Sequence, residues 1–517
     1  MKVAVGAPDA AELITRNDAP RGPDLAREAD LPGAADMASA TDGAGAADLA
    51  SAAVASNEAV AADEAAKHAP LGSATRRLLE GPVLPALLRL ALPNMLVVVV
   101  QATSSTIDAF FVARLGTDVL AGVALVLPAW MLMVTMSAGG IGGGIASAIA
   151  RALGGGRRAD ANALVLHGLI IGAALAAAFS AALLTLGEPL YRALGGQGEA
   201  LEAALAYSTI VFSGAIAIWL VNVLASVLRG SGEMQFPALV IVAGEVLHVL
   251  LAPSLIFGLG PFPALGVRGA ALSLVTSYAL RTAALAIYLL TSRSQLRLGL
   301  AKPHAKYFVD ILRVGLPAAA NTVLTNINVA AVTGIVGTFG TAALAGYGLG
   351  ARLEYLQIPL VFGFGTALVT LVGTNVGAGQ IARARRITWV GAGLAAALTG
   401  SIGLLTAFVP RLWLGLFTSA PDVLAVGETY LHLVGPAYGL FGLGLALYFA
   451  AQGAGRLLWP LLAGIMRVVI AAVGAWVAVY VLNAGLAGAF VAITVSFIVF
   501  GGAQALAVSS TLRARTR

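Results

Sequence analysis

Three acidic residues, Asp108, Glu245 and Glu354, stand inside long apolar stretches of this sequence. On insertion scales, an ionised side chain at the depth of a lipid bilayer costs about 2.5–3.5 kcal/mol. Such a group therefore needs a partner, a water-filled cavity or a function. Because carboxylates can carry a proton or hold a metal cation, these three residues are the first candidates for chemistry.

Asp108 lies near the end of the first apolar stretch, six residues before Arg114. In a helix that rises 1.5 Å per residue, this places it roughly 9 Å from that end. Oxygens of Gln101, Thr106 and the hydroxyl residues between them could help to bind Na⁺ or hydrogen-bond a carboxyl group. We expect coupling to H⁺ or Na⁺ at Asp108, and no structural metal. The alternative is a carboxylate that pairs with Arg114 or reaches the membrane surface.

Glu245 and His248 are three residues apart in the fifth apolar stretch. That spacing places both side chains on one face of a helix. Desolvated Glu and His groups titrate near neutral pH, so the two residues could form a proton relay. A satisfied hydrogen-bonded pair with no role in coupling explains the spacing equally well.

Arg352, Glu354 and Tyr355 lie near the middle of the eighth apolar stretch. Because Arg352 and Glu354 are two positions apart, they do not share a helix face, and each needs a partner from elsewhere. We expect a coupling or substrate site here, with a structural ion pair between helices as the alternative. Tyr355 could also line a cavity for flat cations through cation–π contact, although a single aromatic residue more often serves packing. The same applies to Phe110, Tyr207, Tyr347 and Tyr438.

The segments that must position these residues are membrane-spanning helices. Of the 517 residues, 59% are hydrophobic and 11% are charged, against about 25% charged in soluble domains. About 20 apolar residues span a bilayer as a helix. The sequence predicts an all-α membrane protein with twelve such spans, at 84–113, 119–149, 161–187, 201–228, 236–258, 266–291, 309–339, 342–374, 387–409, 423–451, 457–482 and 485–511.

The basic residues set an orientation for these spans. With the N-terminus inside, seventeen Lys and Arg residues fall in connections on the cytoplasmic side and four on the other side. Cytoplasmic loops of membrane proteins carry such an excess. We therefore expect a bacterial inner-membrane protein with both termini in the cytoplasm, and a positive charge that belongs to membrane loops and not to nucleic-acid binding.

An internal repeat divides the spans into two halves. The motif LRLALP at 88–93 recurs as LRVGLP at 312–317, and GTDVLAG at 116–122 recurs as GTAALAG at 340–346. Six helices per half give both halves the same topology, which predicts two parallel lobes around a central cavity that rock against each other for alternating access. We expect the molecule to be a monomer.

Four segments follow from the repeat and the composition. The Ala-, Asp- and Gly-rich N-terminus cannot bury enough apolar surface to order itself. The basic connection between the halves is either a solvated linker or a surface helix on anionic lipid. The segments are a disordered cytoplasmic tail (1–75), an N-terminal six-helix lobe (76–291), a cytoplasmic linker (292–308) and a C-terminal six-helix lobe (309–517).

Several classes of protein are excluded or disfavoured by missing motifs. No Gly-Lys pair occurs, so the chain has no phosphate-binding P-loop for ATP hydrolysis. Cysteine is absent, and no histidine begins an HExxH metalloprotease motif. The glycine run at 139–144 lies inside a span, where it permits close packing or bending. We expect a transporter without a cofactor that is driven by an ion gradient.

The order of the motifs along residues 80–515 resembles the MATE (multidrug and toxic compound extrusion) family. The matching segments are LPNMLVVVVQATSSTIDAFFVARLGTDVLAGVAL, LRGSGEMQFP, LGVRGAALS and ARLEYLQIPLVFGFGTALVTLVGTNVGAG. The resemblance implies a V-shaped bundle of two six-helix lobes. It also implies antiport, in which inward H⁺ or Na⁺ drives export of small amphipathic, often cationic compounds, with Asp108 matching the family's first-helix acid.

The sequence departs from that family at two places. Many members carry Asn and Asp four residues apart in the fifth helix, where this chain has His248 and Ala252. Many also carry an acid in the seventh helix, where this chain offers Asn321, Asn326 and Asn328. Either Glu245 and His248 replace the missing pair, or coupling depends on Asp108 and Glu354. The coupling ion stays open, with H⁺ favoured.

Two other functions fit a duplicated membrane bundle. A flippase for lipid-linked or polyprenyl precursors belongs to the same superfamily, and such proteins usually have an arginine-rich central cavity. The arginines within the spans, Arg281 and Arg467 among them, are expected mostly near helix ends, which disfavours this function. A receptor or scaffold without transport is disfavoured by the repeat and the buried acids.

Overall fold

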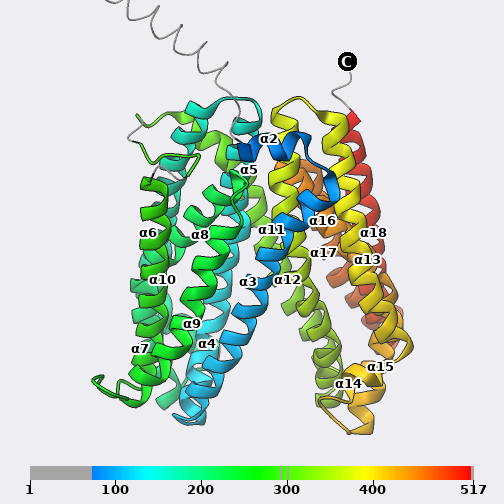
Figure 1. The fold of residues 1–517 in the computed structure, drawn as a ribbon. Coiled ribbons are helices and arrows are strands. Elements are labelled where there is room, and N and C mark those ends of the chain that lie inside the picture. The colour runs from blue at the N-terminus through cyan, green and yellow to red at the C-terminus, as the bar shows by residue number, and fades with distance from the viewer. Residues whose placement is uncertain (1–72, 292–293, 300–301, 514–517) are drawn as a thin grey trace, which may run out of the picture. The chain divides into compact units, whose positions relative to one another are not determined.

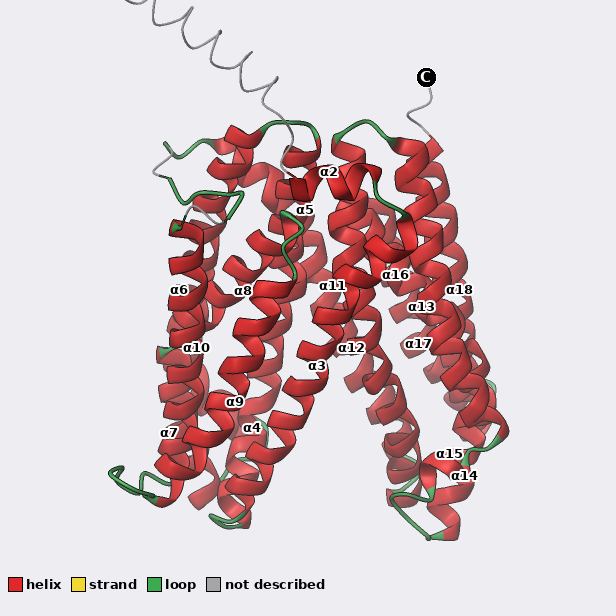
Figure 2. Cartoon of the chain, viewed as in Figure 1, coloured by secondary structure: helices red, strands yellow, loops and turns green. Residues whose placement is uncertain are grey.

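The computed structural model describes residues 73–291, 294–299 and 302–513. Every secondary-structure element in these ranges is a helix (Figure 2), which confirms the predicted all-helical class. The predicted tail, 1–75, lies outside the described residues except for its last three positions. Those three residues are helical, so the first described helix begins before the predicted end of the tail.

All described residues belong to one compact unit. The helices of its first half follow one another along the chain (Figure 1). They are α2 (Ser73–Glu80), α3 (Val83–Ala113), α4 (Thr117–Thr135), the π-helix η1 (Met136–Ile141), α5 (Gly142–Gly154), α6 (Arg158–Ala193), α7 (Gly198–Ser213), α8 (Ala215–Gly230), α9 (Gln235–Phe257) and α10 (Val267–Leu290).

The second half repeats this order of long helices. Its elements are α11 (Ala305–Gly337), α12 (Thr341–Gly377), α13 (Ile381–Phe408), α14 (Arg411–Leu414), α15 (Pro421–Val434), the 3₁₀ turn η2 (Gly435–Ala437), α16 (Tyr438–Ala454), α17 (Leu458–Tyr480) and α18 (Gly485–Arg513). The first four residues of helix α11, 305–308, belong to the predicted linker. The described linker residues, 294–299 and 302–304, form no surface helix.

Eleven continuous helical segments among the described residues are long and apolar enough to cross a membrane. A twelfth span results if α7 and α8, which are bent by 48° at Gly214, are taken as one. The predicted fourth span, 201–228, is therefore a bent pair of helices. The predicted second span contains the π-helical segment η1, because Gly139 and Gly140 lie within it and impose no side-chain constraint on the backbone.

Glycines let the two halves approach each other closely along α5. A Cβ at Gly144 would lie 2.7 Å from the carbonyl oxygen of Ile311 in α11, and the space beside Gly143 holds the side-chain amide of Gln452 in α16. Side chains at either position would push these helices apart. Of the two roles predicted for the glycine run, close packing or bending, close packing is confirmed.

The first helix of each half begins against the other half. Leu87, near the start of α3, lies in a core cluster with Leu368 of α12 and Leu447 of α16. Ile311, near the start of α11, lies in the core cluster of the first half with Ile145 of α5. Farther along, α3 packs on α9 and α11 packs on α17, each within its own half. Helices α3 and α11 therefore connect the two halves, as Figure 1 shows for α3.

Candidate functional site

Asp108 of α3 and His248 of α9 form a hydrogen-bonded pair in the first half. The Nε2 atom of His248 lies 2.6 Å from Oδ2 of Asp108. The His248 side chain is 2% exposed and that of Asp108 is 31% exposed, so the pair joins a buried imidazole to a partly accessible carboxylate. Both groups bind and release protons in proteins, and a single proton between them decides whether the pair is ionic or neutral.

Two alternatives for these residues are not what the structure shows. Arg114 does not neutralise Asp108, because its guanidinium lies over the ring of Phe110, 4.7 Å from the centroid. His248 takes its partner from α3 and not from Glu245 on its own helix. The predicted pair of Glu245 and His248 is therefore wrong. The spacing of three residues correctly placed Glu245 and His248 on one face of α9. Their bonded partners come from other helices, α10 for Glu245 and α3 for His248.

Glu245 pairs with an arginine buried between α9 and α10. Nη1 of Arg281 donates a hydrogen bond of 2.8 Å to Oε1 of Glu245, and both side chains are buried. The guanidinium also donates to the hydroxyl of Ser277, which in turn donates to the carbonyl of Gly244. The ring of Tyr278 covers the cation at 4.6 Å. A buried charge pair with this many hydrogen bonds is satisfied and holds the two helices in register.

Glu354 of α12 has polar neighbours from two other helices of the second half. The hydroxyl of Tyr430, in α15, lies close enough to interact with the Glu354 carboxylate, and Arg467, in α17, attracts it electrostatically. Arg467 donates a hydrogen bond of 3.2 Å to the hydroxyl of Thr325 in α11. A small cavity of about 20 Å³ adjoins Glu354, which is space for about one water molecule.

The repeat relates the two buried arginines in an unexpected way. At the repeat spacings, Arg281 of α10 corresponds to Phe500 of α18, and Gly244 of α9 corresponds to Arg467 of α17. Gly244 leaves the space that Arg281 fills, since a Cβ there would lie 2.5 Å from the arginine Cγ. Arg467 in turn lies over the ring of Phe500 at 5.4 Å. Each half thus holds one arginine between its fifth and sixth long helices, but from opposite sides.

The expected placement of these two arginines near helix ends is wrong. Arg281 is the fifteenth of 24 residues in α10, and Arg467 is the tenth of 23 in α17. Their side chains are 2% and 5% exposed. The sequence showed no acid within one helical turn of either residue, and partners that come from other helices leave no local signal.

The remaining predicted residues divide into those near Glu354 and those elsewhere. Asn328 and Tyr355 line the cavity beside Glu354. Arg352 lies on a different face of α12 from Glu354, and its guanidinium is 5.8 Å from the ring of Phe417.

Four predicted residues have no contact with either acidic site in the described structure. Asn321 packs against Gly464 of α17. The Thr106 hydroxyl and the Asn326 amide donate hydrogen bonds to carbonyl groups of their own helices, and Gln101 is half-buried on α3. Across the described ranges, no three His, Asp or Glu side chains gather as metal ligands. A Na⁺ ion near Asp108 would therefore depend on hydroxyl, amide or carbonyl oxygens.

Tyr430 is the residue at this site that sequence reasoning missed. At the repeat spacing it corresponds to Tyr207 of α7, which lies close enough to Asp108 to interact with its charge. A tyrosine therefore accompanies the candidate acid in each half. Comparing the fourth spans of the two halves, α7–α8 and α15–α16, could have identified it.

Comparisons with known proteins agree with this architecture. A family model described as MatE matches twice, at residues 93–254 and 317–477. The FAD transporter of Shewanella oneidensis is 27% identical over 76% of this chain and 87% of its own length. A probable multidrug resistance protein NorM of Thermotoga maritima is 27% identical over 80% of this chain and 89% of its own length.

Solved structures give the same result. A transporter of the MOP superfamily from Pyrococcus furiosus, for which a binding pocket of reverse polarity has been described, superposes with a TM-score of 0.79 at 26% identity. An outward-facing multidrug resistance MATE family transporter superposes with a TM-score of 0.77, also at 26% identity. Each alignment covers 85% of this chain and 98% of the other.

Proposed function

This chain belongs to the MatE family of membrane transporters, and we propose that it exports small compounds by antiport against H⁺ or Na⁺. It is a multi-pass membrane protein, and its relatives transport compounds and do not catalyse reactions on them. Relatives named as a probable multidrug resistance protein and a multidrug export protein support efflux, and the substrates that we propose are amphipathic, cationic compounds. The FAD transporter relative widens the range of substrates to be tested.

The observation that carries this proposal is the contact between Asp108 and His248. It joins α3 to α9 at 2.6 Å through a carboxylate and an imidazole, two groups that can each carry a proton. Protonation of the carboxylate removes the charge that attracts an imidazolium, so the contact between the helices weakens. Because the start of α3 packs on the second half, a change in the α3–α9 contact acts on the interface between the halves.

Glu354 supplies a second coupling group in the other half. Its carboxylate is held by Tyr430 and Arg467, which come from α15 and α17. Arg467 cannot lose its proton, so its interaction with Glu354 depends only on the state of the carboxylate. Glu245 has a different role, because its ion pair with Arg281 is buried and fully hydrogen-bonded. We assign Glu245 to the positioning of α9, which carries His248.

We favour H⁺ as the coupling ion. His248 can exchange a proton with Asp108, whereas its imidazole is a poor ligand for Na⁺, which prefers oxygen. One charge that moves inward through about 100 mV releases roughly 2.3 kcal/mol. At about 1.4 kcal/mol per factor of ten, this sustains an approximately 50-fold gradient of the exported compound. One titrating carboxylate per cycle is therefore enough.

The excess of basic residues on one side supports an orientation in the bacterial inner membrane with both termini in the cytoplasm. In this orientation, the end of the bundle that carries α2 and the end of α18 faces the cytoplasm. The buried arginines bear on the flippase alternative. Arg281 is engaged by Glu245 within its own half, and Arg467 by Thr325 and two aromatic rings, so neither supplies an arginine-lined central cavity.

The test is efflux from proteoliposomes under imposed gradients of H⁺ or Na⁺, with ethidium as the probe. We expect a pH gradient to drive efflux, and Asp108→Asn to reduce the rate at least tenfold, because an amide cannot carry the proton. The matched control is Asp118→Asn, an exposed acid ten residues along the chain. Normal efflux by Asp108→Asn, or an equal loss in the control, would remove Asp108 from the coupling site.

A further inference from the structure

A basic cavity lies between the two halves, away from the acids described above. It has a volume of about 700 Å³, within the range of pockets that bind small ligands. The first half contributes Arg151 and Arg157, and the second half contributes Lys306, Arg313 and Arg456. Arg151, Arg157, Lys306 and Arg456 belong to the basic residues expected on the cytoplasmic side, and Arg313 is the ninth residue of α11.

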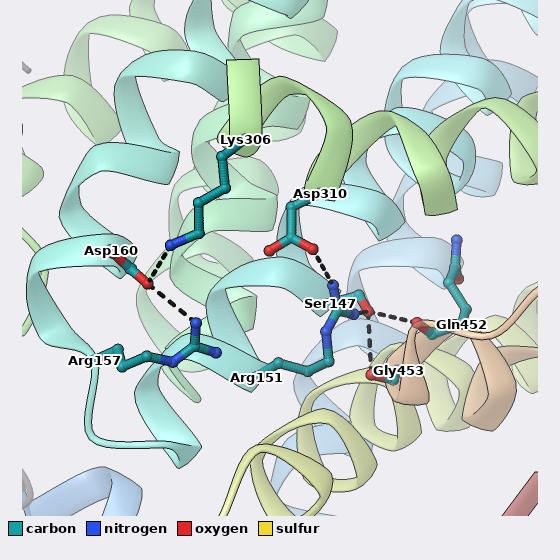
Figure 3. Close-up of polar contacts among 8 residues, drawn as sticks. All are labelled: Ser147, Arg151, Arg157, Asp160, Lys306, Asp310, Gln452 and Gly453. Atoms are coloured by element: carbon teal, nitrogen blue, oxygen red, sulfur yellow. Dashed lines mark hydrogen bonds and ion pairs between the residues drawn. The ribbon is translucent and has the colours of Figure 1, made fainter. Parts of the chain in front are cut away.

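The acids near this cavity neutralise only part of its charge. Asp310, the one acidic residue among those that line it, lies 3.6 Å from Arg151. Asp160 lies just outside the lining and bonds Arg157 at 3.1 Å and Lys306 at 3.4 Å (Figure 3). Five basic and two acidic groups leave a net charge of +3 around one space.

Two of the arginines keep unused hydrogen-bonding capacity. In the described part of the chain, Arg313 has no acidic partner within ion-pair distance, and Arg456 donates one bond of 3.3 Å to the Thr511 carbonyl. Arg157 and Arg313 also lie near enough to Arg151 to repel its charge. Like charges held together in this way favour a bound anion, which replaces repulsion by attraction.

We propose that this cavity binds a phosphate-bearing anion that bridges the two halves. Guanidinium groups present paired N–H donors that match phosphate oxygens, and arginine keeps its charge at any physiological pH. A phosphomonoester brings up to two negative charges and a phosphodiester brings one, so either kind of phosphate offsets part of the excess of +3. A ligand that contacts Arg151 from one half and Arg313 or Arg456 from the other holds the halves together at this end.

The phosphate group can come from a phospholipid headgroup or from a soluble phosphorylated compound. Binding to the purified full chain in neutral detergent is measured as a rise in the thermal unfolding midpoint on titration. Inorganic pyrophosphate is the soluble probe, with ionic strength held constant by chloride. Short-chain phosphatidylglycerol is the lipid probe. Short-chain phosphatidylcholine, which is zwitterionic and has no net charge, is its control.

The variant Arg313→Gln/Arg456→Gln removes the two arginines with spare donors. We expect at least tenfold weaker binding of whichever probe stabilises the unaltered chain. The matched control, Arg297→Gln/Arg386→Gln, removes two exposed arginines expected on the same side that do not line the cavity. If the double variant fails to fold, the single variant Arg456→Gln takes its place.

The outcomes distinguish a soluble phosphorylated ligand, a phospholipid headgroup and a solvated basic face that binds neither. A response to pyrophosphate that only the cavity variant loses assigns a soluble ligand. A rise in the midpoint with phosphatidylglycerol that only the cavity variant loses assigns a lipid. If neither probe raises the midpoint, or if both variants lose binding equally, the arginines form a solvated basic face and the proposal is overturned.

Discussion

Asp108 and Glu245 differ in the cation that each of them contacts. Arg281 lies 2.8 Å from Glu245, and both are buried. Glu245 thus contacts a cation that keeps its charge, whereas Asp108 contacts an imidazole that can itself lose a proton. The difference between a permanent and a titratable cation separates two acids that look alike in the sequence.

This difference predicts how much stability each pair contributes. Glu245→Gln leaves Arg281 buried without its counter-charge, so we expect a loss of about 3–5 kcal/mol in the free energy of unfolding. The control is Glu80→Gln, which breaks the exposed pair of Arg76 and Glu80 and should cost less than about 1 kcal/mol. Thermal unfolding midpoints in detergent compare the two variants.

The double variant Glu245→Gln/Arg281→Met completes that experiment. Removal of both charges eliminates the unpaired buried cation, so the double variant should regain part of the stability that Glu245→Gln loses. Equal midpoints for Glu245→Gln and Glu80→Gln would show that the buried pair does not hold α9 against α10.

Residue types could be predicted from the sequence at this scale, but partners could not. Asp108, Glu245, His248 and Glu354 stood out because each is polar within an apolar run. Their actual partners come from helices 36 to 140 positions away along the chain. Nothing local signals which residue of a distant helix will face them, so Arg281 and Arg467 were not recognised as partners and Tyr430 was missed.

Among the elements, α5 makes the closest contacts between the halves. Helices pack in lipid through small residues that let backbones approach. At Gly144 the neighbouring atoms belong to the backbone of α11, namely the carbonyl of Ile311 and the amide of Gly315, at 2.7 and 2.8 Å from a built Cβ. Backbone atoms cannot rotate away as side chains can.

Gly144→Ala should therefore destabilise the bundle by about 1–3 kcal/mol, the usual cost of overpacking. Gly393→Ala in α13 is the matched control, because no heavy atom lies within 4 Å of the added methyl group. In the control, the gain in helix propensity should leave stability unchanged or slightly higher. Equal unfolding midpoints for the two variants would contradict the close contact of α5 and α11.

The helices themselves were largely predictable, since each is a local apolar run of sufficient length. Two departures have physical causes that hydropathy does not register. The bend at Gly214 divides one predicted span into α7 and α8, and the π-helical turn η1 interrupts another. Both occur at glycines, where the backbone can deviate without a side-chain clash.

At the scale of the whole molecule, the two halves are similar bundles joined at one end. The sequence repeat predicted this arrangement, and the family model that matches once in each half agrees with it. The first half carries its buried arginine on α10, its sixth long helix, whereas the second half carries its own on α17, its fifth. This difference was not predictable from either half alone. It needed both the repeat register and the contacts of Gly244 and Phe500.

We propose that the two halves rock against each other for alternating access, and that the contact between α5 and α12 opens during transport. A Cβ at Gly373 of α12 would lie 2.9 Å from that of Ala150 of α5, slightly inside the usual 3.5–4.5 Å across a disulfide. Because the chain has no cysteine, Ala150→Cys/Gly373→Cys introduces a single defined bridge. Oxidation should stop efflux of ethidium, and a reductant should restore it.

The control bridge lies within one half, where no opening is required. A Cβ at Gly474 of α17 lies 3.4 Å from that of Ala492 of α18, so Gly474→Cys/Ala492→Cys should form a disulfide and keep most of its transport. Loss of free thiols measures cross-linking in both variants. If the bridge between the halves forms fully and efflux continues, the halves do not separate at α5 and α12, and the substrate must pass without the rocking motion proposed here.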